Sequence, residues 1–230
     1  MAERNVLIVG ASRGLGLALA AEYLDRGARV VATVRGEPPA ALQQLESGAD
    51  GRLKIEVVDV TDREGLKQLR KRLDARRFDV VFVNAGICTD IDKTAAEIPP
   101  DNFLRMMLTN VLGAMQTVEI LYDLLTQTGT VAVMSSGLGS VSENSTGAWG
   151  TYAATKAALN MMMRGFASRH EGDGHAMVLT APGWVRTEMG GAEASLGIED
   201  SIPRVVDTVG AQSGRAGLRY LNYRGRTVGW

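Results

Sequence analysis

The chain has 230 residues, of which 45% are hydrophobic and 22% are charged, which is the composition of an ordinary globular protein. Its 25 Lys and Arg residues nearly balance its 26 Asp and Glu residues, and the formal net charge of -1 gives no basic field for nucleic acid or an acidic membrane. We therefore expect one domain over residues 1–230 whose partner is a small molecule.

The start of the chain and its cysteine content bear on where the protein works. Residues 1–4 run directly into the apolar stretch 6–9 without the architecture of a signal peptide. Cys88 is the single cysteine and cannot form an internal disulfide, and no apolar stretch is long enough to predict a membrane-spanning helix. These features predict a cytoplasmic protein.

Short apolar runs alternate with longer helical patterns along the chain. Runs typical of strands cover residues 5–9, 29–34, 53–58, 79–83, 129–134 and 175–180. Patterns typical of helices cover residues 14–26, 62–75, 101–126 and 150–169, and the run 218–230 predicts a last strand and a tail. The alternation predicts an α/β fold, a Rossmann-type three-layer doubly wound parallel sheet. Because ligands of such sheets lie beyond the carboxyl ends of the strands, we expect functional residues directly after each strand.

A glycine-rich segment, GASRGLG at residues 10–16, links the first predicted strand to the first predicted helix. Backbone N–H groups and the positive end of a helix dipole point at whatever binds there, so the segment predicts a pyrophosphate cradle. The residues that we expect to line this cradle are Gly10, Ser12, Arg13, Gly14, Leu15 and Gly16.

Tyr152 and Lys156 are four positions apart, so they share one face of the predicted helix 150–169. A phenol titrates near 10, and a pKa of about 7 requires about 4 kcal/mol of preference for the phenolate. A unit charge about 5 Å away, at an effective dielectric constant of about 20, supplies about 3 kcal/mol. We therefore expect Lys156 to lower the pKa of Tyr152, although the same spacing also occurs on ordinary solvated helices.

With its Gly-x-x-x-Gly-x-Gly spacing, its order of strands and helices and its Tyr-x-x-x-Lys pair, the chain resembles the short-chain dehydrogenase/reductase family over essentially its whole length. Residues 139–141, Asn144 and the stretch 182–190 are similar to the branch that includes sniffer-type carbonyl reductases and the C-factor signalling proteins. The resemblance implies an oxidoreductase that uses a nicotinamide cofactor.

The resemblance implies two catalytic residues besides Tyr152 and Lys156. Ser136 would donate a hydrogen bond to the substrate oxygen as negative charge develops there. Asn110 would anchor a water that relays protons to the lysine, while Tyr152 acts as general acid or base.

The interval from Ser136 to Tyr152 is 16 positions, a few more than is usual in the family, and the extra length falls in the polar stretch 141–147. Ser135 or Ser140 could therefore take the catalytic place instead of Ser136. A serine after a strand can also serve as a turn or a cap, and an asparagine in a helix can serve packing.

The second predicted strand ends in Val34, where an NAD enzyme of this type would carry a carboxylate for the ribose 2′-OH. Arg35 follows at once and Arg13 lies in the glycine-rich segment, and two guanidinium groups can hold a 2′-phosphate dianion. We expect NADP(H) rather than NAD(H), the alternative being that both arginines are solvated surface residues.

Further cofactor contacts after the later strands are implied by the resemblance, although Val83 stands where family members usually carry an asparagine. The implied contacts are Asp59 and Val60 at adenine, Asn84, Ala85 and Gly86 at its ribose, Pro182 and Gly183 on the nicotinamide side, Val185 and Thr187 at the carboxamide and pyrophosphate, with Tyr152 and Lys156 also on the cofactor.

These features together predict an NADP(H)-dependent oxidoreductase that interconverts a carbonyl and an alcohol on a small, largely apolar substrate, with reduction favoured. A signalling or regulatory protein that keeps the nucleotide cradle is the alternative. An epimerase or dehydratase would need more substrate-binding sequence than follows Trp184. We expect residues 186–202 to form the substrate loop, with the glycine-rich part 190–197 either a mobile cover or a plain connector.

The resemblance also implies a homodimer or homotetramer, formed through the helices that carry Tyr152 and Asn110. Met161, Met162 and Met163 suit adaptable apolar packing, in the core or at such an interface. His170 and His175 have no spacing that predicts a metal site. The charge run 63–77 is typical of the solvated face of an amphipathic helix.

Overall fold

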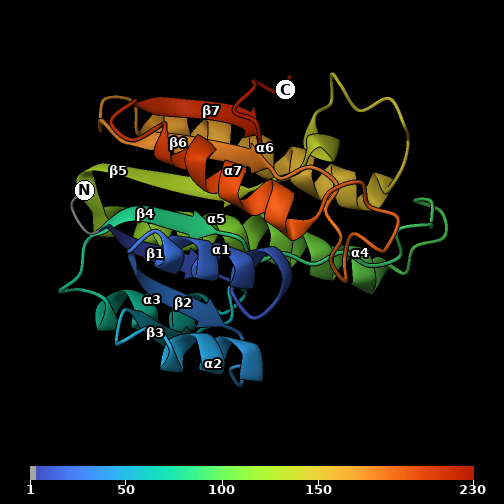
Figure 1. The fold of residues 1–230 in the computed structure, drawn as a ribbon. Coiled ribbons are helices and arrows are strands. Elements are labelled where there is room, and N and C mark those ends of the chain that lie inside the picture. The colour runs from blue at the N-terminus through green and yellow to red at the C-terminus, as the bar shows by residue number, and fades with distance from the viewer. Residues whose placement is uncertain (1–3) are drawn as a thin grey trace.

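Parallel strands form the centre of the molecule. The computed structural model describes residues 4–230, and within them seven strands form one parallel sheet in the order β3-β2-β1-β4-β5-β6-β7 (Figure 1). The strands are β1 (Asn5–Val9), β2 (Arg29–Val34), β3 (Leu53–Val57), β4 (Phe78–Val83), β5 (Leu125–Met134), β6 (Ala176–Ala181) and β7 (Gly217–Asn222). The strand order reverses between β1 and β4, which is where such sheets bind ligands. The predicted doubly wound α/β fold is confirmed.

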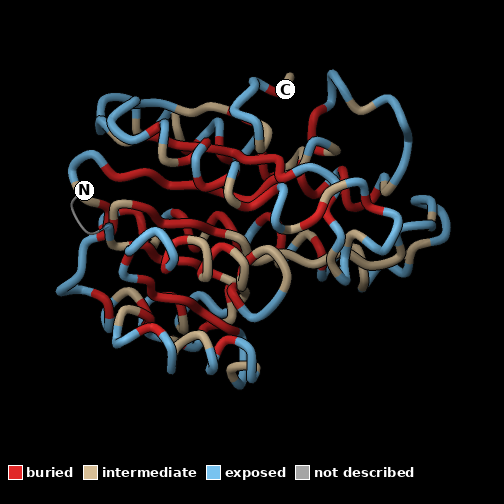
Figure 2. Tube along the Cα trace, in the orientation of Figure 1, coloured by how far each residue is buried: buried red, intermediate tan, exposed pale blue. Residues whose placement is uncertain are grey.

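Helices cover both faces of this sheet and bury its strands (Figure 2). The helices on one face are α3 (Arg63–Arg72), α5 (Ala114–Leu121) and α6 (Gly150–Arg169), and those on the other are α1 (Gly14–Asp25), α2 (Ala40–Ser47) and α7 (Ile198–Gly210). A hydrophobic core lies on each face of the sheet. Along β1, Leu7 and Val9 pack in the core under α3, α5 and α6, whereas Val6 and Ile8 pack in the core under α1, α2 and α7. A parallel strand that is buried on both faces is expected to show this pattern. Within residues 4–230, no helix combines the length and the apolar character that crossing a membrane requires.

The long helix predicted over residues 101–126 is interrupted. It consists of α4 (Pro100–Met107), a π-helical segment (Leu108–Gly113), α5 and a short 3-10 turn (Tyr122–Leu124). The last residues of the predicted helix already belong to β5, which begins at Leu125, so the predicted end was wrong. Gly113 closes the π-helical segment against Val60, since a Cβ at Gly113 would lie 2.9 Å from the Val60 carbonyl oxygen. Apolar periodicity continues through the whole stretch and does not reveal these changes of winding.

Two helices were not predicted. The short helix α2 buries Leu42 alone among its residues and so has little apolar periodicity. The helix α7 contains Pro203, which normally indicates a break, although Ile202, Val206 and Val209 are buried against the sheet. Because α7 begins at Ile198, the loop predicted over residues 186–202 ends at residue 197.

The C-terminal run contains a last strand, as predicted. After β7 the chain turns back on itself, and Thr227 forms an antiparallel bridge with Leu221. The backbone N–H of Val228 donates to the Tyr220 carbonyl at 2.9 Å. Residues 227–230, which we call the C-terminal strap, therefore lie beside the edge strand of the sheet.

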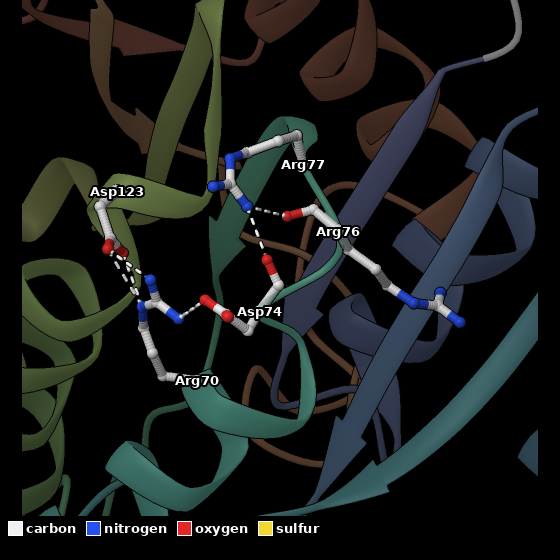
Figure 3. Close-up of polar contacts among 5 residues, drawn as sticks. All are labelled: Arg70, Asp74, Arg76, Arg77 and Asp123. Carbon is white, nitrogen blue, oxygen red and sulfur yellow. Dashed lines mark hydrogen bonds and ion pairs between the residues drawn. The ribbon is translucent and has the colours of Figure 1, made fainter.

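The charge run of residues 63–77 forms an exposed face of α3 and the turn after it. Figure 3 shows the polar contacts of Arg70 and Arg77 in this run. Arg70 donates from Nε and Nη2 to Asp123 at 2.9 and 2.6 Å and from Nη1 to Asp74 at 2.6 Å. Arg77 donates to the carbonyl oxygens of Asp74 and Arg76, both at 2.8 Å. The hydrogen bonds with Asp123 and Asp74 raise the pKa of the Arg70 guanidinium. These contacts dock α3 beside the end of α5, although solvent-exposed ion pairs contribute little each.

Candidate active site

The turn between β1 and α1 closes against the ends of two neighbouring strands. Gly10 adopts a φ of 92°, and a Cβ there would lie 2.7 Å from the backbone of Ala85. The backbone N–H of Ala11 donates to the Thr33 carbonyl at 2.8 Å, and that of Gly10 donates to the Thr33 hydroxyl at 3.2 Å. Asn84 donates from Nδ2 to the Gly10 carbonyl at 2.7 Å. These contacts hold the predicted cradle at the N-terminus of α1.

Glycine is favoured inside this cradle by lack of space at Gly16 and by backbone conformation at Gly14. A Cβ at Gly16 would lie 2.0 Å from the Gly10 carbonyl oxygen. Gly14 has room for a Cβ, which would lie 3.8 Å from the Thr187 methyl group, but its φ of 54° favours glycine. Ser12 is exposed, and Leu15 is half-buried. A diphosphate can therefore approach the backbone closely, so the residues fit the predicted dinucleotide.

Two arginines flank the cradle at its outer side. Arg35 follows β2 directly and is exposed, whereas Val34 before it is buried. Arg13 forms an ion pair with Glu188, and the two side chains are 72% and 73% exposed. Such an exposed pair is strongly screened by water, so a phosphate dianion could compete with Glu188 for Arg13. The side expected to bind the adenosine thus carries positive charge.

The residues predicted for the adenine pocket follow β3. Asp59 accepts hydrogen bonds at Oδ1 from the backbone N–H and the hydroxyl of Thr61, at 2.8 and 2.7 Å. Val60 is buried beneath them. The Asp59 carboxylate thereby stabilises the turn at the end of β3, and this turn lies at the same sheet edge as the cradle.

Asn110 lies in the π-helical segment and is fully buried. Its Oδ1 accepts from the backbone N–H of Ile87 at 2.8 Å, and its Nδ2 donates to the Ile87 carbonyl at 2.8 Å and to the Thr155 hydroxyl at 3.1 Å. A Cβ at Gly86 would lie 3.4 Å from Asn110 Oδ1 and 3.6 Å from Lys156 Nζ. The Asn110 amide therefore joins the segment after β4 to α6 beside the lysine. Irregular π-helical turns are often found at functional sites.

Tyr152 and Lys156 lie together on α6. The Lys156 ammonium lies 5.7 Å from the centroid of the Tyr152 ring and donates to the Met134 carbonyl at 2.9 Å. Both side chains are buried. The pair is thus placed at the carboxyl end of β5, at the sheet edge where a ligand is expected.

Burial sets the protonation of this pair. It lowers the pKa of Lys156 from 10.5 to about 8 and raises the pKa of Tyr152 above its ordinary value. The prediction that Lys156 brings the Tyr152 pKa down was therefore wrong for the protein alone, because the phenol loses its surrounding water on burial. Burial also raises the pKa of the Cys88 thiol to about 11, so this thiol is not activated.

The three candidate serines differ in exposure and in hydrogen bonding. Ser135 is buried and its hydroxyl donates to Asn160 Oδ1 at 2.6 Å. Ser140 is buried and its hydroxyl accepts from the backbone N–H of Glu143 at 3.0 Å. Ser136 is half-buried, and its hydroxyl accepts from the backbone N–H of Leu138 at 3.2 Å, which leaves the hydroxyl proton to be donated. Of the three, Ser136 is the one whose hydroxyl is suited to a substrate oxygen.

The segment after β6 approaches the cradle from the nicotinamide side. The Pro182 carbonyl accepts from the Ser201 hydroxyl at 2.7 Å, and Gly183 has a φ of 85°. Val185 is buried and bridges to residue 196. Thr187 continues this segment to Gly14 of the cradle, and its pyrophosphate contact stays a prediction.

The glycine-rich loop 190–197 is held by local hydrogen bonds. Trp184 donates from its indole N–H to the Gly190 carbonyl at 2.8 Å, and the backbone N–H of Gly191 donates to the Thr187 carbonyl at 2.9 Å. Arg186 donates to the Ala194 carbonyl at 3.0 Å. These bonds fold the loop back onto the segment that follows β6.

Sequence reasoning missed three buried residues of the site, namely Thr155, Asn160 and Tyr220. Thr155 and Asn160 lie on α6 with Lys156, and Asn160 is four positions beyond Lys156, so helical spacing could have indicated it. Tyr220 donates from its hydroxyl to the Ser136 carbonyl across 84 positions of sequence, and no spacing rule indicates such a contact.

Trp149 precedes α6 and borders the tyrosine. Its backbone has a φ of 55°, and its ring meets the Tyr152 ring edge-on with centroids 5.9 Å apart. Trp149 also lines a hollow of about 600 Å³ between residues 91–95 and 147–151, with Phe103 on another wall.

A glycine cradle at the switch point of a parallel sheet, with a buried tyrosine and lysine at the same edge, defines a dinucleotide-binding oxidoreductase domain. The chain belongs to the short-chain dehydrogenase family, since the family model "short chain dehydrogenase" matches residues 4–195. The predicted family resemblance is confirmed.

Solved structures and curated proteins agree with this family. A putative short-chain dehydrogenase/reductase from Burkholderia multivorans with bound NADP is 49% identical, with a TM-score of 0.97 over 99% of this chain and 100% of that one. A carbonyl reductase from Pseudomonas aeruginosa PAO1 in complex with NADP is 36% identical, with a TM-score of 0.91 over 100% of both chains. The C-signal protein of Myxococcus xanthus is 30% identical over 66% of this chain and 92% of its own length.

The buried ammonium of Lys156 predicts a pH-dependent stability. Relative to Lys156→Met, we expect the free energy of unfolding of the cofactor-free wild type to rise by about 1.4 kcal/mol per pH unit above about pH 8. With its pKa lowered from 10.5 to about 8, the folded protein has lost the lysine proton in this range while the unfolded chain still binds it. Raising the pH therefore favours the folded state until the unfolded chain also loses its proton.

Urea unfolding of both proteins between about pH 7 and about pH 10 measures this difference. Lys71→Met, on the exposed face of α3, is the control and should give a difference that does not change with pH. A pH-independent difference for Lys156→Met as well would contradict the buried ammonium.

Proposed function

We propose that the protein is an NADP(H)-dependent oxidoreductase that reduces a carbonyl group on a small, largely apolar substrate. The observation that carries this proposal is the buried pair of Tyr152 and Lys156, 5.7 Å apart from ring centroid to ammonium, beside the half-buried Ser136 turn. The similarity to a carbonyl reductase that was crystallised with NADP supports both the cofactor and the reaction.

Three side chains of this chain would act on the carbonyl. NADP(H), when bound in the cradle, supplies the hydride. The Ser136 hydroxyl donates a hydrogen bond to the substrate oxygen, which stabilises the negative charge that develops there. The Tyr152 hydroxyl then gives its proton to that oxygen, and the Lys156 ammonium stabilises the phenolate that remains.

The Tyr152 hydroxyl carries its proton at neutral pH, as the proposed proton donor must. A phenol whose pKa lies above its ordinary value keeps its proton at neutral pH, which is the state that an acid needs before it donates. The proton-relay water at Asn110 stays a prediction, and the contacts of the side chain give Asn110 a second role. Its amide is occupied by Ile87 and Thr155, so we assign it the role of holding the segment after β4 against α6.

The choice of cofactor follows from charge at the end of β2. Arg35 and Arg13 would bind the 2′-phosphate of NADP(H), because a dianion there gains charge-assisted hydrogen bonds that a 2′-hydroxyl cannot provide. No carboxylate stands at position 34, where valine is buried. NADP bound to a relative that is 49% identical supports the same choice.

Arg35→Asp should reverse the cofactor preference. We expect kcat/KM with NADPH to fall about 10- to 100-fold, because the loss of charged hydrogen bonds is combined with repulsion of the phosphate. The activity with NADH should hold or rise. Arg76→Asp, an equal change of charge on the exposed turn after α3, is the matched control and should leave the ratio unchanged. An unaltered NADPH/NADH ratio in Arg35→Asp would show that the assignment is wrong.

Tyr152→Phe tests the reaction itself. Removal of the proton donor should lower kcat for carbonyl reduction at least about 100-fold, while NADPH still binds with nearly unchanged affinity. Oxidation of NADPH by aldehydes, ketones and quinones measures the first effect, and fluorescence titration measures the second. The function is refuted if the wild type binds NADPH but none of these substrates oxidises it.

A signalling or regulatory role is the second candidate, since the chain is 30% identical to C-signal over 92% of that protein's length. A sensor needs the cradle but has no need of a proton donor beside a buried ammonium. The Tyr152→Phe measurements separate the two, because a sensor would bind NADPH in both forms and turn over neither.

We also propose that the protein forms a homodimer through an exposed apolar face. Leu104, Leu108 and Leu112 lie four positions apart on α4 and the π-helical segment, and Met161 and Met162 lie on α6; each is between 41% and 68% exposed. Both of the first two segments pack against α6, and exposed apolar side chains on neighbouring elements are typical of an interface. The family resemblance favours pairing of these same helices between two copies.

Leu108→Glu should therefore convert a dimer into a monomer, because a charge would be buried in the interface. Sedimentation at micromolar concentration measures the mass of each variant. Val141→Glu, at an apolar residue that is exposed elsewhere, is the control and should leave the mass unchanged. A wild-type protein with the mass of one chain would contradict the proposal.

A further inference from the structure

A buried tyrosine lies behind the turn that carries Ser136. Tyr220 on β7 is 1% exposed, and its hydroxyl donates to the backbone carbonyl of Ser136. The neighbouring Ser135 hydroxyl donates to Asn160 Oδ1 at 2.6 Å, and Asn160 Nδ2 donates to the Gly139 carbonyl at 3.1 Å. The turn of residues 136–139 is thus held at both ends by buried side chains.

Tyr220 is itself held in place by the C-terminal strap. The Trp230 ring contacts the Tyr220 ring with centroids 5.6 Å apart, and the Arg164 guanidinium lies 4.7 Å from the Trp230 ring. The Trp230 carbonyl accepts from the backbone N–H of Ser142 at 2.9 Å, and the backbone N–H of Gly229 donates to Glu143 at 2.5 Å. The strap therefore joins the extra residues between Ser136 and α6 to the tyrosine.

The carbonyl of Ser136 anchors the backbone from which its side chain extends. Ser136 is extended, with φ -157° and ψ 149°, and a hydrogen bond to its carbonyl fixes the peptide plane that follows the residue. Within residues 4–230 the Ser136 hydroxyl bonds only the backbone N–H of Leu138, at 3.2 Å, so its position also depends on the backbone that carries it. A donor to a developing oxyanion has to be held in position before the reaction, and a small displacement lowers the rate considerably.

We infer that Tyr220 is a positioning residue for the reaction, which acts through Ser136 and is fixed by the C-terminal strap. Tyr220 need not touch substrate, because its hydroxyl bonds the side of Ser136 that faces the protein interior. The inference depends on the proposed function, in which Ser136 stabilises the substrate oxygen.

Tyr220→Phe removes the hydroxyl and keeps the ring that packs on Trp230. We expect kcat for carbonyl reduction to fall about 3- to 10-fold, with the KM and the binding affinity for NADPH unchanged. The same substitution in a Ser136→Ala background should have no further effect, since the group that Tyr220 positions is gone. Tyr23→Phe is the matched control, because the buried Tyr23 hydroxyl has no hydrogen-bond partner in residues 4–230.

A second readout does not depend on activity. In the cofactor-free protein, amide hydrogen exchange of residues 136–140 should be faster in Tyr220→Phe than in the wild type, and unchanged in Tyr23→Phe. If Tyr220→Phe fails to fold, Glu143→Ala at an exposed position weakens the strap and should give the same pattern, with a smaller loss of kcat.

Three results would overturn the inference. An unchanged kcat in Tyr220→Phe would show that Ser136 needs no support. An equal loss in the wild-type and Ser136→Ala backgrounds would mean that Tyr220 serves only general stability. Unaltered amide exchange of residues 136–140 in Tyr220→Phe would show that Tyr220 does not hold the Ser136 turn. This result counts against the inference even if the wild type reduces no carbonyl. Failure of the proposed function is recognised separately, by a wild type that binds NADPH and reduces nothing.

Discussion

The buried ammonium of Lys156 is the constraint on which the site depends. Removing such a charge from water is costly, and the Met134 carbonyl at 2.9 Å compensates only in part, since burial still lowers the lysine pKa to about 8. The backbone around the ammonium packs closely against α6. A Cβ at Gly139 would lie 2.8 Å from the Lys156 Cβ, so the turn after Ser136 can lie against α6 only because this residue is glycine. The ammonium, the tyrosine and the serine turn therefore form one packed unit.

The π-helical winding around Asn110 also helps to position the packed unit of Lys156, Tyr152 and the turn after Ser136. In a regular helix the Asn110 amide would be one polar group among apolar neighbours, and its burial would be unfavourable without partners. The π-helical segment directs it to both backbone groups of Ile87 and to Thr155, so its hydrogen bonds are formed within the protein. The end of β4 and the face of α6 are thereby fixed relative to each other, and the cradle joins them through Asn84 and Gly10.

Much of this arrangement could be predicted because a parallel sheet brings the residues after its strands to one edge. Arg35 was located in this way, the cradle by its glycine spacing after the first strand, and the Tyr152 helix by the spacing of Tyr152 and Lys156. The direction in which the Tyr152 pKa shifts could not be predicted. The spacing of the two residues gives the attraction between their charges, but it does not give the water that the phenol loses on burial. Helix α7 was missed because Pro203 indicates a break that its packing against the sheet overrides. The contact of Tyr220 with Ser136 joins residues 84 positions apart, which only the folded chain reveals.

The C-terminal strap restrains the long loop between Ser136 and Tyr152. A longer loop costs little entropy to close, but it constrains the turn at its start less than a short one. In this chain the added stretch is tied at Ser142 and Glu143 to residues of the C-terminal strap, which also packs on Tyr220. The freedom gained by the extra residues is thereby removed at two points, and the serine turn keeps the rigidity that a hydrogen-bond donor to a developing charge requires.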